Sequence, residues 1–288
     1  MILGISGQAL GTTRSLAEIL SLLRKLDVRW IELWPPNLEG GVAPGRGYEG
    51  KDIGKAKDIL TEYGIGVACV TMPVAFVKEM VEDGDVYLAT LKATVDVAEA
   101  LGAGLVNSYC FHWALGHDAD IGPFVKMLRP AAAYAADKGV TLVLENEAHD
   151  ASGTVEGMLR ILEGVGSEAF KTNFDATNYY QASEEPFPYA YRRLKDYVGY
   201  VHVKNGCLHD PAVHNELGRG GTMPRLGEDQ YIHYCPLPEG AVNIEGLLAQ
   251  LREDGYDGFC TLEPHVPPQL VERYYQVEVS YLRRRGVH

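Results

Sequence analysis

Short apolar runs alternate with amphipathic stretches along the whole chain, and this alternation predicts the architecture. Eight runs have the length and composition of buried strands. They span residues 2–6, 30–34, 66–72, 104–111, 140–146, 171–176, 200–205 and 258–264. Most of them are continuously apolar rather than alternating, which is typical of a parallel sheet buried on both faces. We therefore expect eight strands in one parallel sheet.

The segments between these runs have the apolar spacing of amphipathic helices. Several end at a glycine just before the next strand, where a helix C-terminus favours a residue that can adopt positive φ. These glycines are Gly64, Gly102, Gly139 and Gly255. No GxGxxG motif follows the first strand, so the pattern favours a closed (β/α)₈ TIM barrel, an α/β fold, over a doubly wound open sheet. We expect residues 1–288 to form this barrel as a single domain.

One connection is much longer than the others. Residues 206–243 separate the seventh strand from the next helix and are rich in Gly, Pro, Tyr and His. Connections of this length are usually functional or disordered. We expect a long loop that caps the barrel mouth, held partly by Tyr231, His233 and Tyr234; a surface excursion or an oligomer contact is the alternative.

Four of the predicted strands carry an ionisable residue near their C-terminal end. Glu145 ends TLVLE, Asp175 ends TNFD, His202 lies in YVHVK and Glu263 ends FCTLE. A buried strand gains nothing from such a side chain unless a partner offsets its desolvation. Each residue alone has a structural explanation, such as a cap for Asp175 or a core histidine for His202. Because barrel strands end at one rim, however, we expect all four to converge there.

A bound cation explains why three carboxylates would gather. Carboxylates held close together raise one another's pKa, whereas a divalent cation keeps all of them ionised. Three oxygen ligands and one imidazole suit Mn²⁺, Mg²⁺ or Co²⁺, and Zn²⁺ is also tolerated. We therefore expect one divalent metal, with Mn²⁺ as the first choice, held by Glu145, Asp175, His202 and Glu263.

The order of these motifs resembles that of the xylose isomerase-like barrels. The matching elements are Glu145, then Asp175 with Asn178 three residues later, then HVKN at 202–205 and LEP at 262–264. With WIELW at the second strand, the resemblance extends over nearly the whole chain. This superfamily includes ketose 3-epimerases, hydroxypyruvate isomerases, inosose dehydratases and the endonuclease IV group.

The resemblance implies that Glu145, Asp175, His202 and Glu263 are the metal ligands and that Glu145 and Glu263 are also the catalytic acid and base. A metal between neighbouring carbonyl and hydroxyl oxygens acidifies the intervening C–H and stabilises an enediolate. Return of the proton to the opposite face gives epimerisation, and return to the next carbon gives isomerisation. We therefore expect a divalent-metal-dependent isomerase or epimerase that acts on a sugar-like hydroxy-carbonyl substrate.

Three positions depart from the pattern of the ketose 3-epimerases. Asn178 stands where those enzymes usually have the histidine of DxxH, Ala151 replaces a sugar-contacting glutamate, and Leu208 replaces an arginine. These changes put a ketohexose substrate in doubt. The alternative is a lyase on the same scaffold, a dehydratase or decarboxylase acting on an oxidised sugar or cyclitol.

Further residues at the same rim are candidates for substrate binding. His112 could polarise a carbonyl, Lys204 could bind a substrate anion or pair with a ligand carboxylate, and aromatic rings could cover the C–H surface of a sugar. The candidates are Trp34, Phe111, His112, Trp113, Asn178 and Lys204. The aromatic residues could equally be packing. His149, His209 and His214 would join the site if the long connection folds over it.

The composition narrows the partners. A net charge of −13 disfavours binding to duplex DNA and to anionic membranes, which weakens the hypothesis of an endonuclease. We therefore expect a small sugar-like molecule as the partner. No apolar stretch is long enough to span a bilayer, the N-terminus lacks a secretory signal, and the five cysteines form no CxxC pair, so we expect a cytoplasmic protein. A homo-oligomer is an expectation from the resemblance, and a non-catalytic binding module is the remaining alternative.

Overall fold

The computed structural model of the chain describes residues 1–10, 13–41, 47–73, 84–110, 116–210, 212–214, 222–225 and 230–288. Eight parallel strands form a closed barrel, in the order β1-β11-β7-β6-β5-β4-β3-β2. Their bounds are β1 (Ile2–Ser6), β2 (Trp30–Leu33), β3 (Gly66–Thr71), β4 (Leu105–Ser108), β5 (Thr141–Glu145), β6 (Phe170–Asp175), β7 (Val198–Val203) and β11 (Phe259–Leu262). The first strand pairs with both β2 and β11, which closes the sheet and excludes the doubly wound alternative.

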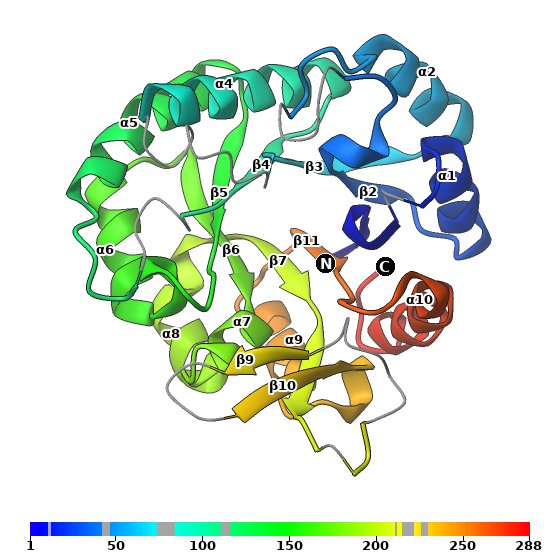
Figure 1. The fold of residues 1–288 in the computed structure, drawn as a ribbon, viewed down its shortest axis with the longest axis vertical. Coiled ribbons are helices and arrows are strands. Elements are labelled where there is room, and N and C mark those ends of the chain that lie inside the picture. The colour runs from blue at the N-terminus through cyan, green and yellow to red at the C-terminus, as the bar shows by residue number, and fades with distance from the viewer. Residues whose placement is uncertain are drawn as a thin grey trace.

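Helices surround the barrel, as the view along its axis shows (Figure 1). They are α1 (Leu16–Lys25), α2 (Ile53–Tyr63), α4 (Gly84–Leu101), α5 (Gly122–Asp137), α6 (Val155–Val165), α7 (Ala176–Gln181), α8 (Tyr191–Leu194), α9 (Ile244–Glu253) and α10 (Pro268–Arg283). The predicted helix-ending glycines all adopt positive φ, between 62° and 80°. The predicted (β/α)₈ barrel is therefore confirmed.

The first helix shows how local sequence fixes an element. Ser15 is its N-cap and forms a capping box with Glu18, in which each side chain accepts from the other residue's backbone N–H. Such a cap typically contributes about 1 kcal/mol. The apolar residues Ile19, Leu20 and Leu23 of this helix are completely buried, so α1 packs firmly against the barrel.

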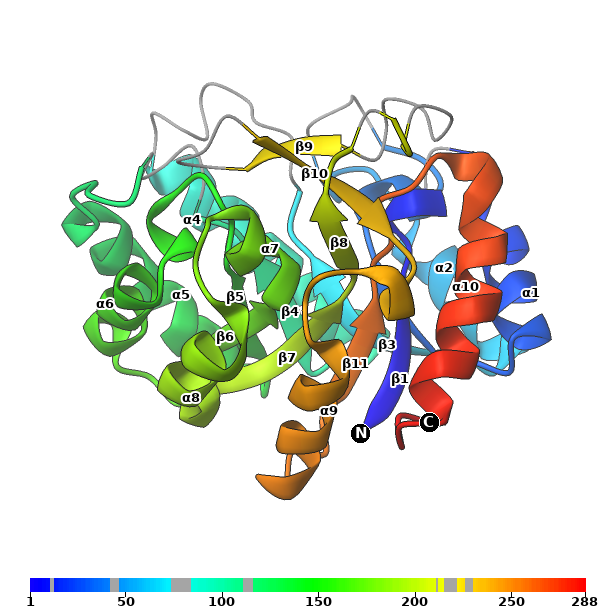
Figure 2. The same cartoon turned by 90° about the horizontal axis from the view of Figure 1, so that it is seen from below.

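The long connection after β7 contains a second, three-stranded antiparallel sheet. It consists of β8 (Asn205–Leu208), β10 (Gln230–Cys235) and β9 (Thr222–Arg225), in that order. The predicted seventh strand ran to residue 205, but β7 ends at Val203 and Asn205 already belongs to β8. Figure 2 shows β9 and β10 beyond the end of the barrel toward which the barrel strands run.

Among the described residues, no helix is long and apolar enough to cross a membrane. Three of the cysteines, Cys69, Cys110 and Cys260, are completely buried and free. They act as small apolar residues of the core.

Candidate functional site

Four ionisable side chains from successive barrel strands meet at the rim. Glu145 and Asp175 are the last residues of β5 and β6, His202 is on β7, and Glu263 follows β11. One ligand atom from each lies within 4.8 Å of the others, and all four residues are buried. The strand register brings them there, since Asp175 pairs with His202 and the Glu263 amide donates to the Val203 carbonyl at 3.2 Å.

Asp175 has one oxygen committed to structure and one directed to the cluster. Its Oδ1 accepts hydrogen bonds of 2.9 Å from the backbone N–H groups of Thr177 and Asn178, which caps α7. Its buried Oδ2 accepts no hydrogen bond from a described residue. The cap predicted as an alternative for Asp175 is therefore real, but it leaves a carboxylate oxygen available.

Glu145 is held by amide side chains on three sides. Asn107 Nδ2 donates to its Oε2 at 2.9 Å, and Asn173 Nδ2 donates to the same oxygen at 3.4 Å. Asn178 Nδ2 donates to Oε1 at 3.3 Å. These donors fix the direction of the Glu145 carboxylate.

His202 is fixed by a carboxylate behind it. Its Nε2 lies 2.9 Å from Glu32 Oε2, and its Nδ1 lies 3.1 Å from Glu145 and 3.3 Å from Glu263. Burial lowers the pKa of His202, but Glu145, Glu263 and Glu32 raise it well above its usual range, so the ring is cationic here. As a metal ligand it would keep its proton on Nε2, donated to Glu32, and turn the lone pair of Nδ1 toward the cation. Carboxylate partners of this kind orient the histidine ligands of metal sites.

Lys204 places its ammonium group among the same carboxylates. Its Nζ donates to Glu263 Oε2 at 2.8 Å and lies 2.8 Å from Asp175 Oδ2, at an angle that does not make a hydrogen bond. Glu145 Oε1 is 4.0 Å away. Of the two roles considered for Lys204, the structure therefore shows pairing with the predicted ligand carboxylates.

The charges in this cluster are not balanced. Burial raises the pKa of Asp175 and of Glu32, although Lys204 and His202 oppose the shift. Burial opposes ionisation of Glu263 as well, but His202 and Lys204 hold its pKa well below its usual range. Two cationic groups thus face four buried carboxylates, and an additional cation would stabilise their ionised forms.

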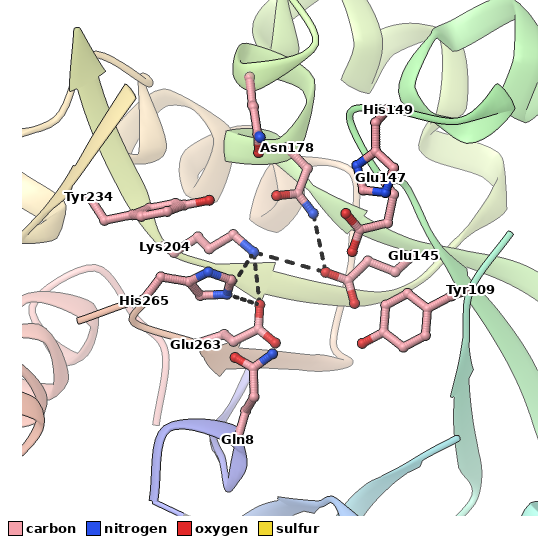
Figure 3. A pocket seen from close by; sticks show the side chains of 11 residues that line it. Gln8, Tyr109, Glu145, Glu147, His149, Asn178, Lys204, Tyr234, Glu263 and His265 are labelled. Carbon is pink, nitrogen blue, oxygen red and sulfur yellow. Dashed lines mark hydrogen bonds and ion pairs between the residues drawn. The ribbon is translucent and has the colours of Figure 1, made fainter. Parts of the chain in front are cut away.

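A cavity of about 60 Å³ opens beside the cluster. Its lining includes Glu145, Glu263, Lys204 and Asn178 of the predicted site, and Tyr234 reaches it from β10. These side chains point toward a common centre in Figure 3. His149 also lines the cavity, whereas His209 and His214 do not, so only the first of these three histidines joins the site.

The predicted aromatic contacts are only partly described. Trp34 is not among the lining residues of this cavity; its ring lies 6.2 Å from that of Tyr109, and its Nε1 donates to Ser6 Oγ at 2.9 Å. The Trp34 side chain is buried, and its contact with substrate stays a prediction. Phe111, His112 and Trp113 lie outside the described residues.

Several site residues were missed from the sequence. The most informative is Glu32, whose signal was an ionisable residue inside the apolar run WIELW. The cavity is also lined by Gln8, Tyr109, Glu147, Gln181 and His265. His265 Nε2 lies 3.3 Å from Glu263 Oε2. Burial, together with Glu145, raises the pKa of Glu147 well above its usual range.

The residues present fit a divalent cation. Carboxylate oxygens from Glu145, Asp175 and Glu263 converge with a ring nitrogen of His202, and the buried Asp175 Oδ2 is paired with the Lys204 ammonium but accepts no hydrogen bond from a described residue. This donor set suits cations that prefer oxygen with some nitrogen, such as Mn²⁺, Mg²⁺ and Co²⁺.

Comparison with known proteins is consistent with this geometry. The family model described as xylose isomerase-like TIM barrel matches residues 20–285. No curated protein sequence matches the chain.

Solved structures match over nearly the entire chain. The probable 3-DHS dehydratase AsbF of Bacillus anthracis is 15% identical and covers 99% of this chain and 100% of its own, with a TM-score of 0.72. The IolI protein with bound zinc is 14% identical, with 99% and 98% covered and a TM-score of 0.72. D-Allulose 3-epimerase from Methylomonas sp., in complex with D-allulose, is 19% identical, with 99% and 97% covered and a TM-score of 0.70. At these identities the likeness shows a shared fold.

Proposed function

The chain belongs to the xylose isomerase-like TIM barrel family, and from this premise we propose that it is a metal-dependent isomerase or epimerase of a sugar-like hydroxy-carbonyl compound. The observation that supports the proposal most strongly is the convergence of Glu145, Asp175, His202 and Glu263 within 4.8 Å. We assign these four residues as ligands of one divalent metal. Mn²⁺ is our first choice because the set has three oxygens and one nitrogen.

The metal's contribution is to polarise neighbouring carbonyl and hydroxyl oxygens of the substrate, which acidifies the C–H between them. Glu145 and Glu263 are our candidates for moving the proton. Both line the cavity, so both reach the space that a substrate would occupy. One carboxylate removes the proton and the other returns it, to the opposite face for epimerisation or to the neighbouring carbon for isomerisation.

Other residues of this chain orient and assist. Asn107, Asn173 and Asn178 hold Glu145 in position through their amide groups. Lys204 and His265 contact Glu263 and favour its ionised form. Glu147 lines the cavity with a raised pKa, so it is a candidate proton donor to a substrate oxygen.

We also propose that residues 206–243 cap the site. Tyr234 of β10 lines the cavity, and its ring lies 4.8 Å from that of His265. The three-stranded sheet thus supplies part of the cavity wall beside Lys204.

A lyase is the second candidate, favoured by the environment of two positions. Ala151 is completely buried in the apolar core, and Leu208 is 42% exposed at the end of β8. Neither can make the polar sugar contact that the corresponding residues make in ketose 3-epimerases. The similar protein from Bacillus anthracis is named a probable 3-DHS dehydratase, which supports a lyase as the second candidate. A substrate with a β-hydroxyl leaving group would then lose water after proton removal.

The two candidates are separated by following exchange and elimination in D₂O. Protein stripped with EDTA and reloaded with Mn²⁺ is incubated with a panel of keto-sugars, oxidised sugars and cyclitols. Solvent deuterium in recovered substrate or its epimer supports the first candidate, and an unsaturated product that absorbs in the ultraviolet supports the lyase. Neither exchange nor elimination with any compound, in protein shown to hold the metal, would contradict both.

A further inference from the structure

The antiparallel sheet carries a second group of potential ligands, distinct from those in the barrel. His209 follows β8, His214 lies in the turn of residues 212–214, and His233 is on β10. One ring nitrogen of each lies within 4.8 Å of the others. His214 and His233 line a separate cavity of about 370 Å³, whose lining also includes residues of α10.

The strand register explains why these side chains share one face. His233 pairs with Cys207, and the His209 amide continues the ladder by donating to the Tyr231 carbonyl at 2.8 Å. Residues that are opposite each other in an antiparallel pair point to the same face, and successive residues alternate. Tyr234 therefore faces the barrel cavity while His233 faces the cavity beside α10.

His214 is brought to this face by a turn that closes on Asp210. The Asp210 amide donates to His214 Nδ1 at 2.8 Å, and the His214 amide donates to the Asp210 carbonyl at 2.8 Å. The His214 ring stacks on that of His233, with centroids 4.2 Å apart and an angle of 14° between the planes. A residue outside the sheet thus adds a third imidazole to the two on the ladder.

The burial of His233 has no explanation in hydrogen bonding. This residue is 2% exposed, yet neither ring nitrogen has a partner among the described residues, and Nδ1 of His209 also lacks one. A buried polar nitrogen without a partner is destabilising.

We propose that His209, His214 and His233 bind one zinc ion, which fastens the 212–214 turn to the β8–β10 ladder. Three imidazoles form a borderline-soft donor set, which suits Zn²⁺ and disfavours Mg²⁺ and Mn²⁺. Three protein ligands with a fourth position open to the cavity match the coordination of accessible zinc sites. Coordination also gives the buried nitrogen of His233 the partner that it lacks.

The three histidine nitrogens must move slightly closer together to bind this ion. Zn–N bonds of about 2.0–2.1 Å in a tetrahedral site place ligand nitrogens roughly 3.4 Å apart. The three nitrogens, which lie within 4.8 Å of one another, therefore move closer together, and the stacked His214 and His233 rings turn toward a common point. Nδ1 of His214 accepts the bond from the Asp210 amide, and zinc coordination through either ring nitrogen displaces that bond, because the proton moves to Nδ1 when Nε2 binds the ion.

The test is zinc stoichiometry of the full chain, measured by competition with a chromogenic chelator after EDTA stripping. Wild type should bind two Zn²⁺ per chain, one in the barrel and one in the sheet. His209→Ala and His233→Phe should each remove one equivalent, with at least a 100-fold loss of affinity at that site. Asp175→Asn, which weakens the barrel site alone, should keep the sheet site unchanged.

His288→Ala is the matched control, because His288 is an exposed histidine remote from the sheet cluster. This control variant should bind two Zn²⁺ per chain, as wild type does. Circular dichroism verifies folding, and the half-buried His209 keeps the test decisive if His233→Phe does not fold. One equivalent in wild type that persists in His209→Ala would overturn the proposal, as would two equivalents in both histidine variants. Either result leaves the barrel assignment standing, because Asp175→Asn reports on that site separately.

Discussion

Glu32 Oε2 lies 2.9 Å from His202 Nε2, and both side chains are completely buried inside the barrel. Thr71 Oγ1 donates a hydrogen bond to the other oxygen of Glu32, so the carboxylate is held from both ends. This fixed position of the ring determines where its other nitrogen points. Its Nδ1 is turned toward Glu145 and Glu263, where the proposed metal would need a ligand.

Replacing Glu32 by Gln should weaken metal binding without removing any ligand. The amide oxygen can still accept from Nε2, but the negative charge that increases the basicity of His202 is lost. Changes to such supporting residues typically cost about 10–100-fold in metal affinity. Titration of EDTA-stripped protein with Mn²⁺ measures the effect. Glu39→Gln, at an exposed acid that pairs with Lys55, is the control. Equal affinities in the two variants would refute the role of Glu32.

We expect Lys204 to stabilise the metal-free protein. Its ammonium group is buried against Glu263 and Asp175, so Lys204→Met leaves two carboxylates without their cation. Breaking a buried ion pair typically costs about 3–5 kcal/mol. We expect a fall in melting temperature in EDTA that is much smaller at saturating Mn²⁺. Lys55→Met, at an exposed lysine, should not change the melting temperature in EDTA or at saturating Mn²⁺. A loss that metal does not reduce would contradict this account.

Tyr234 tests whether the three-stranded sheet contributes to the substrate site. Tyr234 lines the barrel cavity, whereas Tyr231 on the same strand is 51% exposed. We expect Tyr234→Ala to raise KM several-fold, because part of the cavity wall is removed, while Tyr231→Ala leaves KM unchanged. Steady-state kinetics on the substrate found in the D₂O screen measure both. Identical KM values in the two variants would mean that the sheet is not part of the site.

The buried Glu278 of α10 should make the stability of the protein depend on pH. Burial raises its pKa from 4.5 to about 8, and its Oε2 has no hydrogen-bond partner among the described residues. The folded state binds the proton of Glu278 more tightly than the unfolded state does. The resulting contribution to the free energy of unfolding is therefore fully present below about pH 4.5 and is lost as the pH rises toward about 8.

Glu278→Gln should therefore melt higher than wild type at pH 8, by several degrees, with the difference shrinking toward pH 5. The gain at pH 8 is on the order of 2–4 kcal/mol, from about 1.4 kcal/mol per pKa unit. Melting curves in EDTA at pH 5, 6, 7 and 8 measure it, with the exposed Glu253→Gln as control. A constant difference across this range would rule out titration of Glu278.

The sequence predicted the barrel because local signals agreed along the chain. Continuous apolar runs marked the strands, and glycines such as Gly64 and Gly139 marked helix ends that do adopt positive φ. The convergence of Glu145 with Glu263 followed from the topology, since parallel strands of a barrel end at one rim. These features need no knowledge of side-chain packing.

Features that depend on packing or distant pairing were not predicted. The burial of the Trp34 ring beside Tyr109 depends on packing, so the sequence left both packing and substrate contact open for this residue. The ladder between β8 and β10 joins segments whose register is set in three dimensions, so the 206–243 connection was interpreted only as a loop. Glu32 was missed because its partner, His202, lies 170 residues away in the chain.

The central claim is that the barrel cluster binds one divalent cation, and Mn²⁺ binding to EDTA-stripped protein tests it most directly. Mn²⁺ prefers oxygen-rich sites, so the titration reports on the barrel rather than on the three histidines of the sheet. Wild type should bind one Mn²⁺ per chain, and Asp175→Asn should bind it at least 100-fold more weakly. No binding to folded wild type, or equal binding to both proteins, would contradict the assignment.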